Sequence, residues 1–213
     1  MADMELLISV GPNPRAVRFF MAENGLTLPE RVIDLPGGEN RRAEFLAINP
    51  AGQLPVLLLA DGSAIAEAPV ICNYLAEHFG TPALTGDTPR ARAEIQMWLR
   101  RVEQHYTSVL TAAFRYGPGL AVFSNRVRCL PEAAEGMAAL VKDGEAWLNA
   151  QLAEREWLAN DRLTLVDIVL FCFVDFAEKR AGLPLDSSNI HLAKWKERVA
   201  ARPGATLTEA LPR

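Results

Sequence analysis

The chain has 213 residues, of which 50% are hydrophobic, and its formal net charge is −4. Because the lysines and arginines are scattered, the sequence offers no basic surface for a nucleic-acid backbone or an anionic membrane, and neither partner is expected. The first residues are acidic and only a short apolar run follows them. We therefore expect neither a secretory signal nor a membrane span, and a cytoplasmic location.

The chain contains three cysteines, Cys72, Cys129 and Cys172, which lie far apart within apolar or helical patterns. An odd number of separated cysteines is typical of free thiols in a reducing compartment. Neither the cysteines nor the histidines show the spacing of metal ligands, so no metal site is expected.

The N-terminal part alternates between strand and helix patterns. A helical stripe follows Gly11-Pro12-Asn13-Pro14, and the turn Asp61-Gly62 separates two short apolar runs that predict a hairpin. The predicted strands cover residues 5–9, 31–35, 55–59 and 63–66, and the predicted helices cover residues 17–25, 42–46 and 71–78. The expected order is βαβαββα, which defines an α/β domain.

Residues 81–89 are rich in glycine, proline and threonine and predict a linker. Beyond them the sequence shows long helical stripes and no pair of strands, with interruptions at Gly117-Pro118-Gly119 and Pro131. We therefore predict a first domain over residues 1–80, a linker over 81–89 and an all-helical bundle over 90–213.

Local chemistry specifies one helix start in the second domain. Thr164 is a typical N-cap residue, and Asp167 stands where its carboxylate can accept from the free amide of Thr164. Leu163 and Ile168 have the spacing of a hydrophobic staple. The pattern predicts a stable helix start and gives no indication of a catalytic role.

Four segments together resemble a known family. They are residues 49–57 (Asn-Pro-Ala-Gly-Gln-Leu-Pro-Val-Leu), residues 65–68 (Ile-Ala-Glu-Ala), the first helix over 15–26 and the capped helix start over 157–168. In order and spacing they resemble the soluble glutathione transferases, and the Gly-Pro-Asn-Pro turn is similar to that of bacterial-type members. The resemblance implies a thioredoxin-like first domain, a helical second domain, a homodimer, and glutathione as co-substrate without a metal.

The resemblance also implies how one half of glutathione is held. Leu54-Pro55 would be a cis bond, although most such bonds are trans, and the backbone before it would pair with the cysteinyl part. Gln53 is expected near the glycyl end, where Asn40 or Arg41 would supply another group.

The γ-glutamyl half is expected at the end of the hairpin. By resemblance, Glu67 meets the γ-glutamyl ammonium and the backbone amide of Ala68 meets the γ-glutamyl carboxylate. The family commonly has serine or threonine at the position of Ala68, so one bond from a hydroxyl is missing here. A carboxylate at Glu67 would also suit a helix start for purely local reasons.

The reaction needs the thiolate of glutathione, which a helix N-terminus can favour. Gly11 occupies the position that often carries serine, threonine or cysteine in the family, and no tyrosine is nearby. Two alternatives remain: the hydroxyl of Ser9, or the side chain or backbone N–H of Asn13. Ser9 could instead bond a neighbouring backbone group, and Asn13-Pro14 is also a plain helix-start signal.

A second pocket is expected where the helical domain faces the turn before the first helix. Its candidate residues are Gly11, Pro12, Tyr106, Phe114, Arg115, Tyr116, Phe123 and Phe173. Arg115 could steer an anionic group, although a buried aromatic residue on a helix is more often plain core.

The expected function is transfer of the glutathione thiolate to a hydrophobic electrophile. Two alternatives stay open: a binding or scaffold protein that keeps the fold without the chemistry, and a glutathione-dependent reductase or lyase. The absence of a cysteine at the turn after the first strand disfavours redox chemistry.

Overall fold

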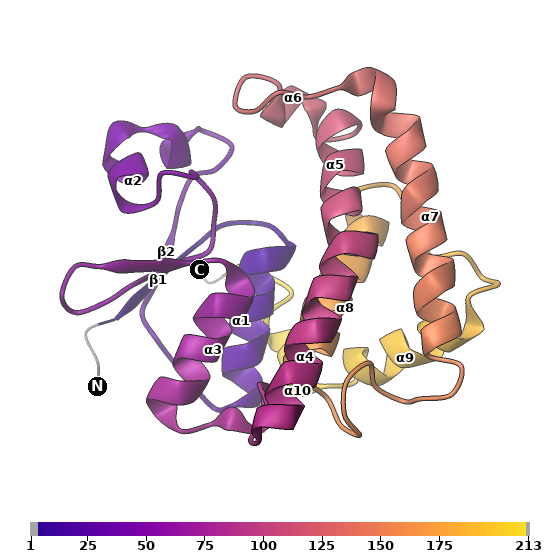
Figure 1. The fold of residues 1–213 in the computed structure, drawn as a ribbon. Helices are drawn as coiled ribbons and strands as arrows, with labels where there is room; N and C mark the ends of the chain where they lie inside the picture. The colour runs from indigo at the N-terminus through magenta and orange to yellow at the C-terminus, as the bar shows by residue number, and fades with distance from the viewer. Residues whose placement is uncertain (1–3, 212–213) are drawn as a thin grey trace. The chain divides into compact units, whose positions relative to one another are not determined.

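The computed structural model describes residues 4–211, which form two compact units (Figure 1). The first unit runs from the start of the described chain to Thr85 and also includes the segment that begins at Arg202. The second unit runs from Gly86 to Ala201.

The first unit is built on a mixed sheet of four strands in the order β2-β1-β3-β4. Strands β1 and β2 are parallel, whereas β1 with β3 and β3 with β4 are antiparallel. The elements are β1 (Glu5–Ile8), α1 (Pro12–Glu23), β2 (Glu30–Val32), the 3₁₀ turn η1 (Glu39–Arg41), α2 (Ala43–Ile48), β3 (Val56–Leu58), β4 (Ala64–Ala66), α3 (Ala68–Phe79), the 3₁₀ turn η2 (Pro82–Leu84) and α10 (Pro203–Leu207). The predicted order βαβαββα is confirmed within the N-terminal region.

The second strand was predicted over residues 31–35, and this prediction was wrong at the C-terminal end of the strand. The strand stops at Val32, because the N–H of Leu35 turns back to the carbonyl of Ile33 and the N–H of Asp34 donates to the Glu39 carboxylate. A short-range turn therefore replaces the ladder where apolar alternation favoured a strand.

The C-terminal segment packs on helix α1 of the first unit. The Arg202 guanidinium pairs with the carboxylate of Glu23 at the end of α1, and the N–H of Gly204 donates to the same carboxylate at 3.0 Å. A Cβ at Gly204 would stand 2.2 Å from a ring carbon of Phe19, so only glycine allows this approach. The segment adds to the first unit, whereas the sequence pattern groups it with the helices after residue 90.

The second unit is helical throughout, and no strand occurs between Gly86 and Ala201. Its elements are α4 (Pro89–Val102), a π-helical turn η3 (Glu103–Thr107), α5 (Ser108–Tyr116), α6 (Leu120–Phe123), the 3₁₀ turn η4 (Pro131–Ala133), α7 (Ala134–Gln151), α8 (Leu165–Lys179) and α9 (Ile190–Ala200). Helix α5 packs against α7, and α4 packs against α8. Along residues 4–211 no helix combines the length and the apolar character that crossing a bilayer requires.

The start of α8 confirms the predicted capping box. The fully buried Asp167 carboxylate accepts from the N–H of Thr164 at 2.9 Å, and it also accepts from the N–H of Leu158 and the indole N–H of Trp195. Burial raises the pKa of Asp167, and these donors act in the opposite direction. One carboxylate thus joins the loop before α8, the start of α8 and helix α9.

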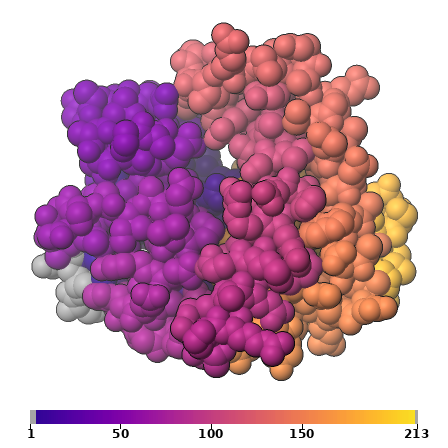
Figure 2. All heavy atoms as spheres, in the orientation of Figure 1, coloured from indigo at the N-terminus to yellow at the C-terminus, as the bar shows by residue number. Residues whose placement is uncertain are grey.

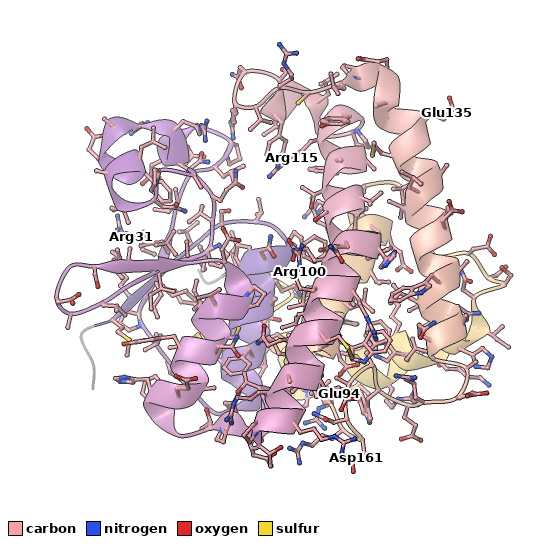
Figure 3. The ribbon with its side chains drawn as sticks, in the orientation of Figure 1. Arg31, Glu94, Arg100, Arg115, Glu135 and Asp161 are labelled. Carbon is pink, nitrogen blue, oxygen red and sulfur yellow. The ribbon has the colours of Figure 1, made fainter. Side chains whose placement is uncertain are left out.

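We predict that Asp167→Ala lowers the free energy of unfolding by about 3 kcal/mol or more, because it leaves several buried donors without an acceptor. Urea denaturation of the full chain measures the change. Asp161→Ala is the matched control, since Asp161 lies exposed in the loop before α8 (Figure 3), and it should change stability by less than about 0.5 kcal/mol. A loss below about 1 kcal/mol in Asp167→Ala would contradict this role.

We also predict that ending the chain at Ala201 destabilises the first unit by about 2 kcal/mol or more. The deletion uncovers the ring of Phe19 and leaves the Glu23 carboxylate without its partners. Thermal unfolding checks this against a control chain that ends at Thr208 and so keeps α10. Equal melting temperatures for the two truncated chains would show that α10 does not support the unit.

Candidate functional site

The register of three strands brings the predicted loops to one end of the sheet. Leu7 on β1 pairs with Val56 on β3, and Val56 pairs with Ala66 on β4. These three paired residues lie at one end of the sheet, because β1 ends just after Leu7, β3 begins at Val56 and β4 ends at Ala66. The residues just beyond the strands, Ser9 and Glu67, therefore lie at the same sheet end as the loop that leads into β3.

The turn between β1 and α1 decides which groups could meet a thiolate. The Ser9 side chain is buried, and its hydroxyl donates to the carbonyl of Val10 at 3.3 Å. Gly11 caps α1 at a φ of 141° without a side-chain hydrogen bond, and Asn13 is exposed in the first turn. Asn13 is thus exposed, whereas the hydroxyl of Ser9 is bonded to the backbone of the next residue, Val10.

The loop before β3 is held by side chains from η1 and from its own beginning. The Leu54-Pro55 bond is cis, as the resemblance implies. Asn40 is 5% exposed, and its amide donates to the carbonyl of Gly52 at 2.6 Å. Gln53 is half-buried beside it. The structure therefore places Asn40 inside the loop rather than on its outer surface.

The start of α3 carries backbone strain at the predicted γ-glutamyl position. Glu67 caps the helix with a φ of 69° and a ψ of 115°, and its side chain is exposed. Ala68 is buried as the first helical residue, so its N–H has no acceptor within the helix. A non-glycine residue at positive φ costs about 1–3 kcal/mol and marks a position where the surroundings fix the backbone.

Gly11 and Pro12, two of the residues predicted for the second pocket, lie in the first unit, and the others divide into two groups within the helical unit. Tyr106 and Phe173 are buried, and burial strongly raises the pKa of Tyr106. The Phe114 ring meets the rings of Phe123 and Phe176 edge to face at centroid distances of 6.1 and 4.8 Å. Phe176 was not predicted for a pocket, because its spacing in the sequence is typical of the buried stripe of a helix, whereas in the structure it is half-buried.

Arg115 joins this aromatic group from α5 (Figure 3). Its guanidinium carbon lies 5.2 Å from the ring centre of Phe123, within the range of a cation–π interaction. Burial lowers the pKa of Arg115, although a guanidinium stays charged at neutral pH. Phe114, Arg115 and Tyr116 are all half-buried, so this part of α5 combines aromatic surface with a positive charge.

A groove of about 220 Å³ lies in the first unit, and none of the residues predicted for the site is among its lining residues. It is lined by Arg31, Ile33, Glu39, Arg42, Glu44, Phe45 and Ile48, from β2 to α2. In the space-filling view, side chains close most of the gaps that the ribbon leaves around α2 (Figure 2).

Among residues 4–211 no group of three or more metal-ligating side chains is found.

Comparison with known proteins gives a match for each region. The N-terminal domain model of glutathione S-transferase matches residues 10–78, and the C-terminal domain model matches residues 109–203. Glutathione S-transferase 2 of Saccharomyces cerevisiae is 32% identical over 200 residues, which cover 91% of this chain and 83% of that protein.

Two solved structures extend the comparison. A glutathione S-transferase domain-containing protein from Marinobacter aquaeolei is 36% identical with a TM-score of 0.85, over 94% of this chain and 99% of that one. Gtt2 from Saccharomyces cerevisiae is 28% identical with a TM-score of 0.89, over 96% and 99% of the two chains. The thioredoxin-like first domain and the all-helical second domain are thereby confirmed.

The strain at Glu67 predicts an uncommon result for a glycine substitution. Glu67→Gly should raise the free energy of unfolding by about 1 kcal/mol, because glycine accepts a positive φ without steric cost. Glu77→Gly, at an exposed position of the same helix, should instead lose about 1 kcal/mol. Chemical denaturation of both variants measures whether the free energy of unfolding changes in opposite directions. A lower free energy of unfolding in both variants would show that the backbone at Glu67 is not strained.

Proposed function

This chain belongs to the glutathione S-transferase family, and from that premise we propose that it joins the thiolate of glutathione to an electrophilic carbon of a hydrophobic substrate. The observation that carries the proposal is the gathering of the β1–α1 turn, the loop before β3 and the start of α3 at one end of the sheet. These three segments carry residues that the resemblance assigns to glutathione. The proposed setting is a cytoplasmic homodimer.

In this proposal glutathione lies across the three segments. The exposed carboxylate of Glu67 meets the γ-glutamyl ammonium, and the free N–H of Ala68 meets the γ-glutamyl carboxylate. The backbone of Leu54, next to Pro55, pairs with the cysteinyl part, and Gln53 lies towards the glycyl end. Backbone groups would thus supply much of the recognition.

The thiolate is proposed to lie at the start of α1, with Asn13 as its contact. Pro12 and Pro14 have no N–H, and the N–H of Arg15 donates to the carbonyl of Gly11 at 3.4 Å. Among the backbone N–H groups of the first four residues of α1, that of Asn13 is therefore the one without an acceptor in the helix, and the Asn13 side-chain amide lies exposed beside it. The positive end of the helix dipole adds to the stabilisation of the anion.

The aromatic group of the helical unit suits a hydrophobic electrophile. Phe114 and Phe123 offer apolar ring surface, and Arg115 beside them favours a substrate or transition state that carries negative charge. The enzyme would contribute thiolate stabilisation and proximity, and the electrophile would lose its leaving group or gain the sulfur across an activated double bond.

The role of Asn13 can be tested with a nitro-activated aryl chloride as the electrophile. We expect Asn13→Ala to lower kcat/KM about tenfold or more and to raise the pKa of bound glutathione, followed by the ultraviolet absorbance of the thiolate. Ser9→Ala should stay within about threefold of the wild type, because the hydroxyl already donates to Val10. The reverse pattern would move the role to Ser9.

Calorimetric titration of the wild type with glutathione separates the proposed activity from its alternatives. Binding followed by conjugation supports the proposal, whereas binding without turnover of any electrophile supports a scaffold protein. Reduction of a glutathione mixed disulfide without conjugation would support the redox alternative. Sedimentation that shows only monomer would remove the proposed homodimer.

A further inference from the structure

Three consecutive carbonyls before β3 each accept a bond from a side chain. The guanidinium of Arg41 donates to Ala51 at 3.3 Å, the amide of Asn40 to Gly52 at 2.6 Å, and the amide of Asn49 to Gln53 at 2.9 Å. We call this set, Asn40, Arg41 and Asn49 on carbonyls 51–53, the carbonyl clamp. Two of its donors come from η1 and the third from the end of α2, so the loop is held on both sides.

Further bonds close the loop tightly around Asn49. The Asn49 carboxamide oxygen accepts from the N–H of Ala51 at 3.2 Å, and the Asn49 carbonyl accepts from the N–H of Gly52 at 2.9 Å. Gly52 has a φ of 61°, and a Cβ there would stand 2.4 Å from a guanidinium nitrogen of Arg41 and 3.0 Å from the carbonyl oxygen of Asn40. Glycine is therefore required both by the backbone angle and by the close approach of η1.

The burial of Asn40 separates two possible roles. Only 5% of the residue is exposed, its Nδ2 donates to the carbonyl of Gly52, and its Oδ1 is buried without a hydrogen-bond donor. A group in this position has little surface to offer a tripeptide. Through Gly52, however, it fixes the segment that continues into Leu54, whose backbone the proposed function assigns to the cysteinyl part of glutathione.

We propose that Asn40 is a positioning residue, which acts on glutathione through the Gly52 carbonyl and not by touching the glycyl carboxylate. The inference rests on the proposed function. In the free protein the carbonyl clamp already holds the loop in its binding conformation, so glutathione does not have to order it. Loss of the clamp should therefore weaken glutathione binding and leave the chemical step unchanged.

The test uses the full chain, glutathione and γ-glutamylcysteine, which lacks the glycyl residue. Asn40→Ala should raise the KM for glutathione roughly tenfold with kcat within about twofold of the wild type, as expected for binding shared by ground and transition states. The KM for γ-glutamylcysteine should rise by the same factor, because the loop is proposed to pair with the cysteinyl part, which both thiols contain. A defect that disappears with γ-glutamylcysteine would assign Asn40 to the glycyl carboxylate and overturn the inference.

Asn24→Ala is the matched control. Its amide also donates to a carbonyl of the first unit, that of Phe20 at 2.9 Å, so its loss removes a similar bond at the far end of α1. Both variants should lose stability, but only Asn40→Ala should change the KM. An unchanged KM in Asn40→Ala would overturn the inference.

Hydrogen exchange without any ligand distinguishes this inference from the proposed function. The amides of residues 51–53 should exchange faster in Asn40→Ala than in the wild type, and Asn24→Ala should leave them unchanged. If these amides exchange at the same rate in Asn40→Ala as in the wild type, the carbonyl clamp does not hold the loop, and the inference is overturned even if glutathione binds. A wild type that binds neither thiol would overturn the proposed function and, with it, the binding role of Asn40, whatever the exchange shows.

Discussion

The pairing of Leu7, Val56 and Ala66 across three strands is the constraint on which the proposed site depends. Leu7 and Val56 are fully buried, and so are their neighbours Leu6 and Leu57 on the other face, so a shift of one residue in either strand would exchange the side chains that pack on the two faces of the sheet. The hydrophobic core thereby fixes where β1 ends, where β3 begins and where β4 ends. The loops that carry the polar residues inherit their positions from this register.

The resemblance leaves a hydroxyl missing at Gly11 and at Ala68, and the proposed site relies on the backbone at both positions. Each stands at the start of a helix, where the helix dipole and the N–H groups without a helical acceptor favour an anion. The backbone of two of the segments proposed for the site contains a residue at positive φ, Gly52 in one and Glu67 in the other. At position 11 the backbone itself favours glycine, because Gly11 has a φ of 141°.

Much of the fold was predictable because its signals are local. The hairpin follows from Asp61-Gly62 between two apolar runs, and the start of α8 follows from Thr164 and Asp167 three residues apart. The role of Asn40 was not predictable, since it depends on a contact twelve residues away with a loop whose path the sequence does not state. The end of β2 was missed because a turn at residues 33–35 overrides apolar alternation there.

The packing of the C-terminal segment shows how far the site depends on distant sequence. Helix α1, whose start is proposed to meet the thiolate, is bonded to this segment at three levels: Arg15 to the carbonyl of Ala205, Arg18 to the carbonyl of Ala210, and Glu23 to Arg202 and Gly204. The segment therefore runs along α1 and can hold the direction of its axis. The helix dipole acts along that axis, so the field at the proposed sulfur position depends on residues about 190 positions later in the chain.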